Sequence, residues 1–291
     1  MGVRGRRGQE GAMSPDTPKV AFTGTKATML ATLYARAVQS AAPDPVLADP
    51  WAVEAVAALD YDFRRLRTRR TDTVSVAVRA RTFDRLALEM LAREPGAAVL
   101  HLGCGLDSRA LRIGVPPSGA WYDVDYPDVV DLRRRLLPAP EGEYHLLGAS
   151  LTGSAWLAEV PSERPVAVVA EGVLPYLEEG AVVALLRGIV GRFPQGEAAF
   201  DALSRRALRL AALHRTLRAT GAALRWGIDD AGELEAAVPG LVFVSAPGIA
   251  SPADLAKLPW AYRMLVRIPA VRRMARVLCY RFPAVRPSER A

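Results

Sequence analysis

Two glycines and an acid stand where short apolar runs of the sequence end. Gly103 and Gly105 follow the apolar run at residues 99–102, and Asp125 follows Gly105 by 20 residues, at the end of the run 120–124. Glycines in such a turn let the backbone approach a ligand closely, and an acid about 20 residues further on can accept hydrogen bonds from ribose hydroxyls. The residue types and their spacing therefore predict a pocket for a ribonucleoside.

The residues around this turn argue against a phosphorylated ligand. Ser108 replaces the third glycine of a dinucleotide-binding turn, and Asp107 stands next to it. An acid beside a helix amino terminus competes with a phosphate for the same backbone N–H groups, and the lysine of a triphosphate-binding loop is absent. S-adenosylmethionine fits these residues better, because it carries no phosphate and has a positively charged sulfonium.

A second acid stands in a comparable position. Glu171 directly follows the apolar run at residues 166–170, and Gly172, Pro175 and Tyr176 shape the turn after it. Ligands of open α/β sheets bind at this edge, where a buried carboxylate needs a cationic partner such as a ligand ammonium or sulfonium. The alternative is that Glu171 only caps the following helix.

The order of apolar runs predicts how these residues are positioned. Short apolar runs alternate with helical patterns along the central part of the chain, which is typical of a doubly wound, mostly parallel α/β sheet. Five strands are predicted at residues 99–102, 120–124, 144–147, 166–170 and 198–201, and two further runs at residues 223–228 and 241–245 would complete a seven-stranded sheet.

Four regions are predicted around this sheet. A basic disordered tail at residues 1–18 precedes a helical cap at residues 19–95, which is interrupted by prolines. A Rossmann-like core follows at residues 96–250, with an inserted arginine-rich helix at residues 203–220, and a basic helical extension occupies residues 251–291.

Composition limits the other function classes. The chain has 291 residues, of which 51% are hydrophobic and 24% charged, enough to bury the core of one large α/β domain. Its two cysteines, Cys104 and Cys279, cannot form a disulfide framework and suit a reducing compartment, so a cytoplasmic location is expected. No apolar stretch is long enough for a transmembrane segment, and no signal peptide is recognisable.

The net charge of +7 has one source in the sequence. Residues 255–282 contain seven lysines and arginines and no acid, which equals the whole surplus. The central region lacks the basic residues interleaved with stacking aromatics that are typical of nucleic-acid binders, so no nucleic acid is an expected partner. We interpret the basic stretch as the solvated face of a helical extension, and a surface for an acidic partner or for membrane headgroups as the alternative.

Three motifs, taken in order, carry a family resemblance: LGCGLDSR at residues 102–109, WYDVDYP at 121–127 and AEGVLPYL at 170–177. Together they resemble the leucine carboxyl methyltransferase family. The later segments WGIDDAGELEAAVPGL and ADLAKLPWAYRMLVRIP are similar to its bacterial branch of tetracenomycin-type polyketide O-methyltransferases. The resemblance covers roughly residues 19–282. It implies the fold of a class I S-adenosylmethionine-dependent methyltransferase, S-adenosyl-L-methionine as cofactor and no metal.

The resemblance also implies roles for individual residues. Arg79 would bind the methionyl carboxylate, and Glu171 would meet the methionyl amino group. The remaining implied cofactor contacts are Gly103 and Gly105 along the methionine, Asp125 at the ribose and Lys26 from the cap. Arg81 is a rival to Arg79, because spacing does not settle which side chain turns inward.

One segment departs from the family pattern. The family usually has Asp-Leu after the third strand, where the acid accepts a hydrogen bond from the adenine amino group. Here Ser150 and Leu151 occupy these positions. A serine hydroxyl can still accept that bond, but a neutral bond is weaker than a charge-assisted one. A lower cofactor affinity is therefore expected, and the alternative is that a shifted residue substitutes for the acid.

The choice of acceptor follows from the residues that could act as a base. Methyl transfer from a sulfonium to an anion cancels charge, so the protein mainly aligns the reactants and excludes water. A carboxylate with a pKa of about 4 is ionised at neutral pH, whereas a phenol near 10 needs a base. None of His101, His145 and His214 stands where a base is required. Carboxyl methylation is therefore expected, and hydroxyl methylation of a phenol stays open.

Two further interpretations concern the acceptor. Tyr176 is the candidate catalytic residue: it could orient the reacting carboxyl, or it could merely pack. The 35 arginines against three lysines are typical of a GC-rich bacterial genome. They favour a small carboxylic acid of secondary metabolism, such as an aromatic polyketide in antibiotic biosynthesis, over a protein substrate.

Two other function classes stay open. A nicotinamide-dependent reductase would share the glycine turn, but no lysine lies near Tyr126 or Tyr144 in the sequence to complete a proton-donating pair. A catalytically idle cofactor-binding protein, acting as a partner or regulator, is the other alternative. The sequence leaves the oligomeric state open.

Overall fold

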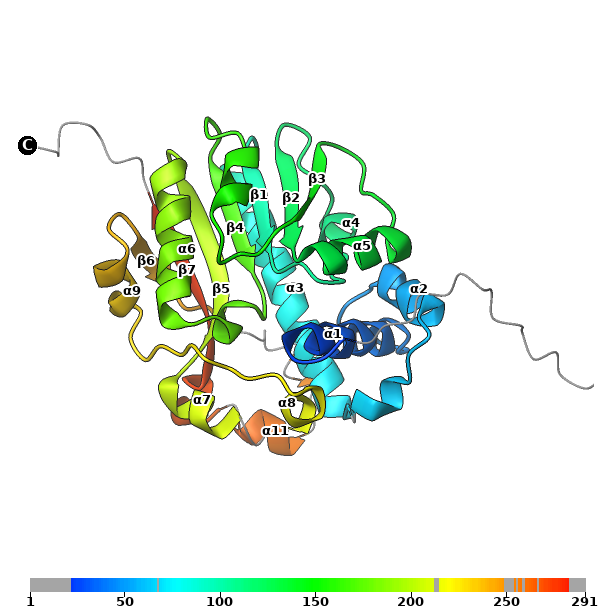
Figure 1. Cartoon of the computed structure of the whole chain (residues 1–291). Helices are drawn as coiled ribbons and strands as arrows, with labels where there is room; N and C mark the ends of the chain where they lie inside the picture. Colours follow the sequence, from blue (N-terminus) through cyan, green and yellow to red (C-terminus); the bar gives the residue numbers. More distant parts are fainter. Residues whose placement is uncertain are drawn as a thin grey trace, which may run out of the picture.

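The computed structural model describes residues 22–66, 68–211, 215–248, 254, 256–257, 260–265 and 267–282. Its centre is a seven-stranded sheet with the strand order β3-β2-β1-β4-β5-β7-β6 (Figure 1). The first five strands are parallel, and β7 runs antiparallel to its neighbours β5 and β6. The strands are β1 Ala98–Leu102, β2 Ala120–Asp125, β3 Tyr144–Gly148, β4 Val166–Ala170, β5 Gly196–Leu203, β6 Val242–Ser245 and β7 Ala275–Phe282.

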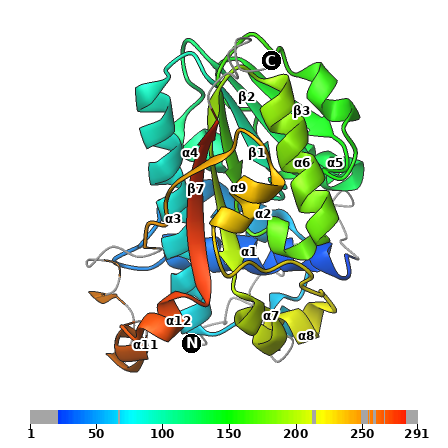
Figure 2. The same cartoon turned by 90° about the vertical axis from the view of Figure 1, so that its left-hand side faces the viewer.

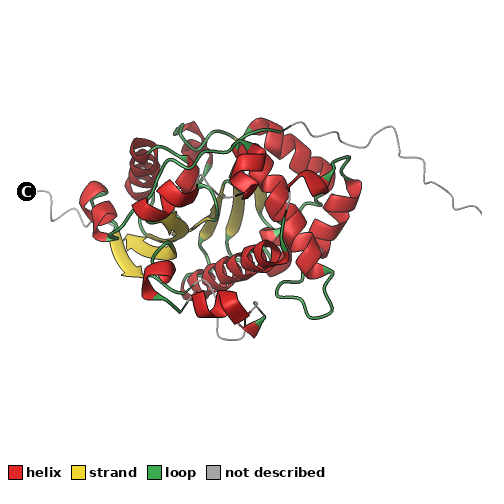
Figure 3. Ribbon diagram, turned by 90° about the horizontal axis from the view of Figure 1, so that it is seen from below, coloured by secondary structure: helices red, strands yellow, loops and turns green. Residues whose placement is uncertain are grey.

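Helices cover both faces of the sheet and one of its ends (Figure 3). The first part of the chain forms α1 Thr25–Ser40, α2 Pro50–Ala58, the short helix η1 Phe63–Leu66 and α3 Arg70–Arg93. The helices between and after the strands are α4 Arg109–Ile113, α5 Pro127–Leu136, η2 Ala155–Glu159, η3 Leu174–Tyr176, α6 Glu179–Arg192, α7 Arg205–Ala211, α8 Arg215–Thr220, α9 Gly232–Ala237, α11 Trp260–Leu265 and α12 Pro269–Arg272.

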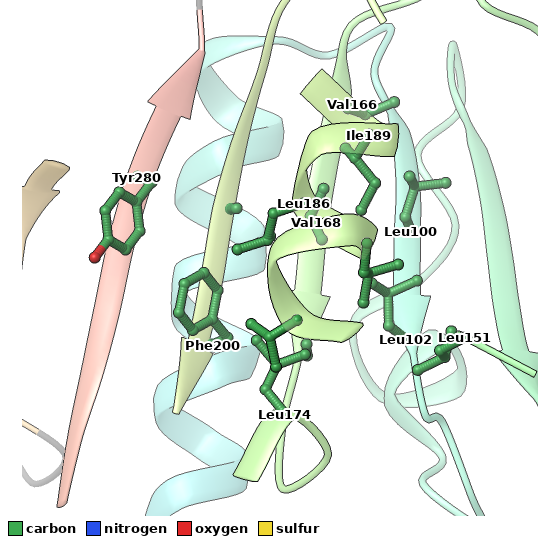
Figure 4. Packing of buried hydrophobic residues seen from close by; sticks show 14 of the residues in the cluster. Leu100, Leu102, Leu151, Val166, Val168, Leu174, Leu186, Ile189, Phe200 and Tyr280 are labelled. Carbon is green, nitrogen blue, oxygen red and sulfur yellow. The ribbon is translucent and has the colours of Figure 1, made fainter. Parts of the chain in front are cut away.

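Alternating side chains of the strands pack against the two helical layers. Leu100 and Leu102 of β1 belong to the same hydrophobic cluster as Leu186 and Ile189 of α6, which lies against one face of the sheet (Figure 4). Val99, the residue before Leu100, belongs instead to a cluster with α3 and α4 on the opposite face. This period of two is what a strand buried on both faces requires.

The sheet changes winding direction between β1 and β4, and this positions the site. These two strands are neighbours, β2 and β3 lie beyond β1, and β5 lies beyond β4. The connections therefore leave the paired strands toward opposite faces, and the crevice between them at the carboxyl ends is where open α/β sheets bind ligands. The doubly wound, mostly parallel fold predicted from the sequence is confirmed.

The helical cap packs as two parts. Helix α1 lies across the carboxyl ends of the strands (Figure 1). Helix α3 continues from the cap onto the sheet, where Phe83, Ala87 and Met90 pack with Val99 and Trp121. The cap is therefore tied to the core by one continuous hydrophobic face.

The strand predicted at residues 223–228 does not form, and that expectation was wrong. This segment crosses the carboxyl end of the sheet, and the N–H groups of Arg225 and Trp226 donate to the carbonyl of Pro175 at 2.7 and 3.1 Å. Trp226 and Ile228 are buried in the core. The apolar residues that suggested a strand are thus satisfied by packing, without strand pairing.

The helical prediction for residues 251–291 was wrong at residues 275–282, which form the strand β7 (Figure 2). This strand lies between β5 and β6 in the sheet. Val277, Leu278, Tyr280 and Phe282 are buried there. Two neighbouring strands supply hydrogen bonds to both edges of this segment, and that tertiary pairing decides its conformation. The short helices α11 and α12 precede it.

One inserted helix was predicted at residues 203–220. The described residues of this segment instead contain two helices, α7 and α8, and β5 extends to Leu203. The predicted tail at residues 1–18 lies outside the described residues.

Within the described part of the chain, no helix has both the length and the apolar character needed to span a membrane.

Candidate functional site

A cavity of about 190 Å³ lies at the carboxyl ends of β1, β2, β3 and β4, under helix α1. Eight of the nine predicted site residues line it: Lys26, Arg79, Gly103, Gly105, Asp125, Leu151, Glu171 and Tyr176. Ser150 does not. Its hydroxyl lies 2.9 Å from the hydroxyl of Thr152, while its neighbours Ala149 and Leu151 line the cavity.

The two glycines of the first turn allow close contacts from other elements. Gly103 has φ +62°, and a Cβ atom added to it would lie 2.5 Å from Cγ2 of Val173 in the turn after β4. Gly105 has φ +50°, and its Cβ would lie 3.0 Å from Cγ of Met29 on α1. Both positions favour glycine through the backbone conformation and through the neighbouring side chain.

Asp125 is held by two backbone N–H groups, one from the turn after β1 and one from the residue that follows Asp125. One oxygen accepts from the N–H of Gly105 and the other from the N–H of Tyr126, both at 2.7 Å. Burial raises the pKa of Asp125 above its ordinary value, although these two hydrogen bonds oppose the rise. A carboxylate has about four acceptor positions, so the two that remain can accept from ribose hydroxyls.

Glu171 lies between two arginines. Its Oε1 accepts from Nε of Arg79 at 2.8 Å, and its Oε2 accepts from Nη2 of Arg109 at 2.5 Å. Arg79 also donates through Nη1 to Asp201 at 3.1 Å. Asp201 in turn accepts from the N–H of Gly172 at 2.7 Å. These bonds hold the start of the turn after β4 against helix α3.

The packing of α3 determines which of Arg79 and Arg81 faces the cavity. Arg79 lines the cavity, whereas Arg81 donates to the carbonyl of Val46 and forms an ion pair with Asp254. Two residues along a helix correspond to about 200° of rotation, so the two side chains leave α3 on opposite sides.

Lys26 has a protein partner at the edge of the cavity. Its Nζ lies 2.5 Å from Oδ2 of Asp128 and 4.7 Å from the centre of the Tyr126 ring. Lys26 therefore joins the start of α1 to the start of α5, next to Asp125.

Tyr176 lies at the end of η3 on the cavity wall. Burial raises the pKa of its hydroxyl, and Thr28 and Arg79 nearby oppose that rise. The hydroxyl is therefore neutral at neutral pH and can donate a hydrogen bond to an acceptor group.

Below the cavity lies a buried ionic network that sequence reasoning missed. Arg109 is fully buried, and its guanidinium donates to Asp84, His101 and Glu171 and pairs with Asp107. A guanidinium only donates, so Nε2 of His101 accepts at 2.9 Å, and its Nδ1–H donates to Asp123 at 2.7 Å. Both ring nitrogens of His101 are thus engaged with partners inside the core.

The other histidines do not reach the cavity. The ring of His145 stacks on Tyr122, with ring centres 4.5 Å apart, and does not line the cavity. His214 lies outside the described residues. Among the described residues, no group of His, Cys, Asp or Glu side chains is arranged to hold a metal ion.

A signal for one missed residue was present in the sequence. Asp201 lies toward the carboxyl end of a buried strand, β5, which is the same rule that identified Asp125 and Glu171. Arg109 had no such signal, because an arginine in a helical pattern is usually exposed.

The charges of the cavity suit a cation more than a phosphate. Lys26, Arg36 and Arg79 line it, and each is paired with carboxylates. The acids that line it are Asp107, Asp125 and Glu171, of which Glu171 is the partner of Arg79. A sulfonium nucleoside with an amino group matches this donor and acceptor set, because its positive charges face acids and its ribose hydroxyls face Asp125.

Comparison with known proteins gives a consistent result. The model of the family described as leucine carboxyl methyltransferase matches residues 27–190, more than half of the chain. The chain is 44% identical over 269 residues to the tetracenomycin polyketide synthesis O-methyltransferase TcmP of Streptomyces glaucescens, covering 90% of this chain and 98% of that protein. It is 41% identical over 248 residues to the S-adenosyl-L-methionine-dependent methyltransferase dpfgK of Gibberella zeae, covering 78% and 83%.

Solved structures share the fold at lower identity. A DUF574 family protein from Streptomyces avermitilis superposes with a TM-score of 0.59 and 17% identity, covering 90% of this chain and 98% of that chain. A candidate methyltransferase from Thermobifida fusca gives a TM-score of 0.56, also at 17% identity, covering 90% and 96%.

Proposed function

The chain belongs to the leucine carboxyl methyltransferase family and is an S-adenosylmethionine-dependent methyltransferase, and we propose that it forms methyl esters on a small, polyketide-like carboxylic acid. The relative from Streptomyces glaucescens is described as an O-methyltransferase of tetracenomycin polyketide synthesis, which supports an oxygen acceptor in such a molecule.

One observation carries the preference for a carboxylate acceptor: the described part of the cavity holds no histidine available as a base. Both ring nitrogens of His101 are engaged, with Asp123 and Arg109. Tyr176 stays protonated, since burial raises the pKa of its hydroxyl. A carboxylate needs no base, because it is already ionised at neutral pH, whereas a phenol does.

We assign the cofactor contacts as follows. Asp125 accepts from the ribose hydroxyls, and Glu171 accepts from the methionyl amino group. Arg79, whose guanidinium lines the cavity, donates to the methionyl carboxylate. Gly103 and Gly105 keep side-chain atoms out of the methionine path.

The other three contacts lie at the edges of the cavity. Leu151 packs on the adenine, and Ser150 beside it accepts from the adenine amino group once its bond to Thr152 opens. Lys26 closes the ribose end through Asp128 and the Tyr126 ring.

The chemistry divides between the cofactor and the chain. S-adenosylmethionine supplies an electrophilic methyl group on a sulfonium. The chain orients the acceptor with the Tyr176 hydroxyl as a hydrogen-bond donor, and helix α1 covers the cavity and keeps water from the acceptor oxygen. Removing water raises the reactivity of the carboxylate, and alignment lowers the entropic part of the barrier.

We further propose a cytoplasmic location. Support comes from the two cysteines, Cys104 and Cys279, which are both free thiols and so need no oxidising compartment.

The acceptor is tested by the stability of the product toward alkali. The purified protein is incubated with S-adenosylmethionine labelled in the methyl group and a metabolite extract of the source organism. Mild alkali cleaves a methyl ester and releases labelled methanol, but it leaves an aryl methyl ether intact. We expect alkali-labile label, and mass spectrometry of the esterified product identifies the acid.

The other outcomes separate the alternatives. Alkali-stable label would establish a hydroxyl acceptor instead. Binding of the cofactor without any labelled product in extracts that contain the native acceptor would indicate a catalytically idle cofactor-binding protein.

A further inference from the structure

We infer that Arg109 is a positioning residue that holds Glu171 in place for the amino group of the cofactor, while Arg79 leaves Glu171 to bind the methionyl carboxylate. This inference rests on the proposed placement of the cofactor. The two arginines that contact Glu171 then have different tasks: the contact from Arg109 is permanent, and the contact from Arg79 is exchanged for one to the ligand.

The two arginines differ in exposure. The Arg79 side chain retains 26% of its exposed surface and lines the cavity, whereas the Arg109 side chain retains none. A ligand in the cavity can therefore contact Arg79 and draw it away. Arg109 lies beneath Glu171, where a ligand in the cavity does not reach it.

The partners of Arg109 fix it from several elements. Its Nε donates to Asp84 of α3 at 2.8 Å, and its Nη1 donates to His101 of β1 at 2.9 Å. Its Nη2 lies 3.0 Å from Asp107 of the glycine-rich turn and 2.5 Å from Glu171. A planar guanidinium held at three nitrogens has no freedom to rotate, so the Glu171 oxygen that it contacts is fixed as well.

The charge balance at Glu171 explains why two arginines are needed. When Arg79 turns to the methionyl carboxylate, Glu171 loses one of its two cationic neighbours. A buried carboxylate without any cationic neighbour is costly, so Arg109 remains the partner of Glu171 until the amino group of the cofactor arrives. Glu171 then lies between Arg109 below and the ligand ammonium above.

The chain offers a matched control for this role. Arg112 lies one turn further along α4 and is nearly as buried. It pairs with the same two acids, Asp84 and Asp107, and also with Asp49. Within the described part of the chain, its hydrogen bonds go to Asp49, Asp84, Asp107 and Ser108 and not to Glu171. Arg109→Lys and Arg112→Lys therefore disturb the same network, and only the first disturbs Glu171.

The test measures two ligands by isothermal titration. S-adenosylhomocysteine carries the amino group, whereas 5′-methylthioadenosine keeps the adenosine and the sulfur but lacks the amino acid part. For Arg109→Lys we expect the affinity for S-adenosylhomocysteine to fall about tenfold or more, with that for methylthioadenosine unchanged within about twofold. Arg112→Lys should leave the ratio of the two affinities at its wild-type value.

A double variant shows whether Arg109 acts through Glu171. In Glu171→Gln, adding Arg109→Lys should cause little further loss of S-adenosylhomocysteine affinity. The inference is overturned if the two losses multiply, if Arg112→Lys lowers the affinity ratio as much as Arg109→Lys, or if Arg109→Lys weakens both ligands equally.

A structure of the wild-type complex with S-adenosylhomocysteine tests the inference even if the variants do not fold. We expect Arg109 to remain in contact with Glu171 and Arg79 to have moved to the ligand carboxylate. Arg109 separated from Glu171 would overturn the inference alone. Wild-type protein that binds neither ligand would overturn the proposed cofactor contacts and this inference together.

Discussion

At the scale of single residues, two aspartates of β2 show how depth along a strand sets chemistry. Asp123 and Asp125 are two positions apart and share a face of the sheet. Asp123 is fully buried and accepts from His101, Trp121, Arg133 and Tyr144. Asp125, at the strand end, has only two backbone donors and faces the cavity. One is therefore structural, and the other is available to a ligand.

Asp125→Asn is expected to weaken binding of S-adenosylhomocysteine by about 10- to 100-fold, because charge-assisted hydrogen bonds to the ribose are lost. Since burial raises the pKa of Asp125, the wild-type affinity should begin to fall at a higher pH than for an ordinary aspartate, as the carboxylate takes up a proton. The variant should lack this part of the pH dependence. Titration calorimetry from about pH 4, near the ordinary aspartate pKa, up to about pH 8 measures both effects. Affinity within twofold of wild type would contradict the assignment.

Tyr176→Phe separates orientation of the acceptor from simple packing. The ring is retained and only the hydroxyl is lost, so we expect kcat to fall about tenfold or more while the affinity for S-adenosylmethionine stays within about twofold. The measurement is steady-state kinetics with the identified acceptor. An unchanged kcat would leave Tyr176 as a packing residue.

At the scale of elements, the cavity depends on turns that fit against one another. The turn after β1 contacts the turn after β4 through Gly103 and Val173, and it contacts α1 through Gly105 and Met29. Each turn therefore helps to set the conformation of the next. Neither glycine contributes a polar side chain, so their importance lies in the space they leave.

Gly103→Ala is expected to destabilise the protein by about 1–3 kcal/mol and to weaken cofactor binding, because its Cβ would lie 2.5 Å from Val173. Gly114→Ala is the control, since Gly114 has φ +83° but nothing within 4 Å, and it reports the cost of backbone strain alone. Val173→Ala added to Gly103→Ala should restore part of the loss. Chemical denaturation measures the three variants, and equal losses for the two glycine variants would rule out the steric explanation.

At the scale of the whole molecule, buried charges join the cap to the sheet. Arg36 of α1 pairs with Asp49 before α2, and Arg112 of α4 contacts the same Asp49. Arg133 of α5 pairs with Asp123 inside the sheet. Removing one partner of such a pair leaves a buried charge without compensation, so these pairs specify how the layers fit together.

Asp123→Asn is expected to lower the free energy of unfolding by about 3–5 kcal/mol. Burial alone would raise the pKa of Asp123, but Arg133, His101 and Tyr144 together lower it to about 2, from an ordinary 3.8. The folded state thus favours the ionised form, and this contribution of about 2 kcal/mol is complete above pH 3.8 and is lost as the pH falls toward 2. Urea denaturation of both proteins across this range should show their difference shrinking. A difference independent of pH would count against an ionised Asp123.

The sequence by itself determined the strand ends and the residues on them. Apolar runs of strand length predicted the first five strands, and residues just after such runs, Asp125 and Glu171, lie at one edge because the strands are parallel. The same rule applied to β5 would have found Asp201. These features depend on local pattern and on one general property of parallel sheets, which the sequence contains.

The tertiary structure alone decided the position of β7, which of Arg79 and Arg81 lines the cavity, and the burial of Arg109. Residues 275–282 become a strand because β5 and β6 pair with both of their edges, and neither partner is adjacent in sequence. Arg79 turns inward because of how α3 packs, and Arg109 is buried because three acids and a histidine from different elements surround it. Each outcome depends on contacts between distant segments, and local periodicity carries no information about those contacts.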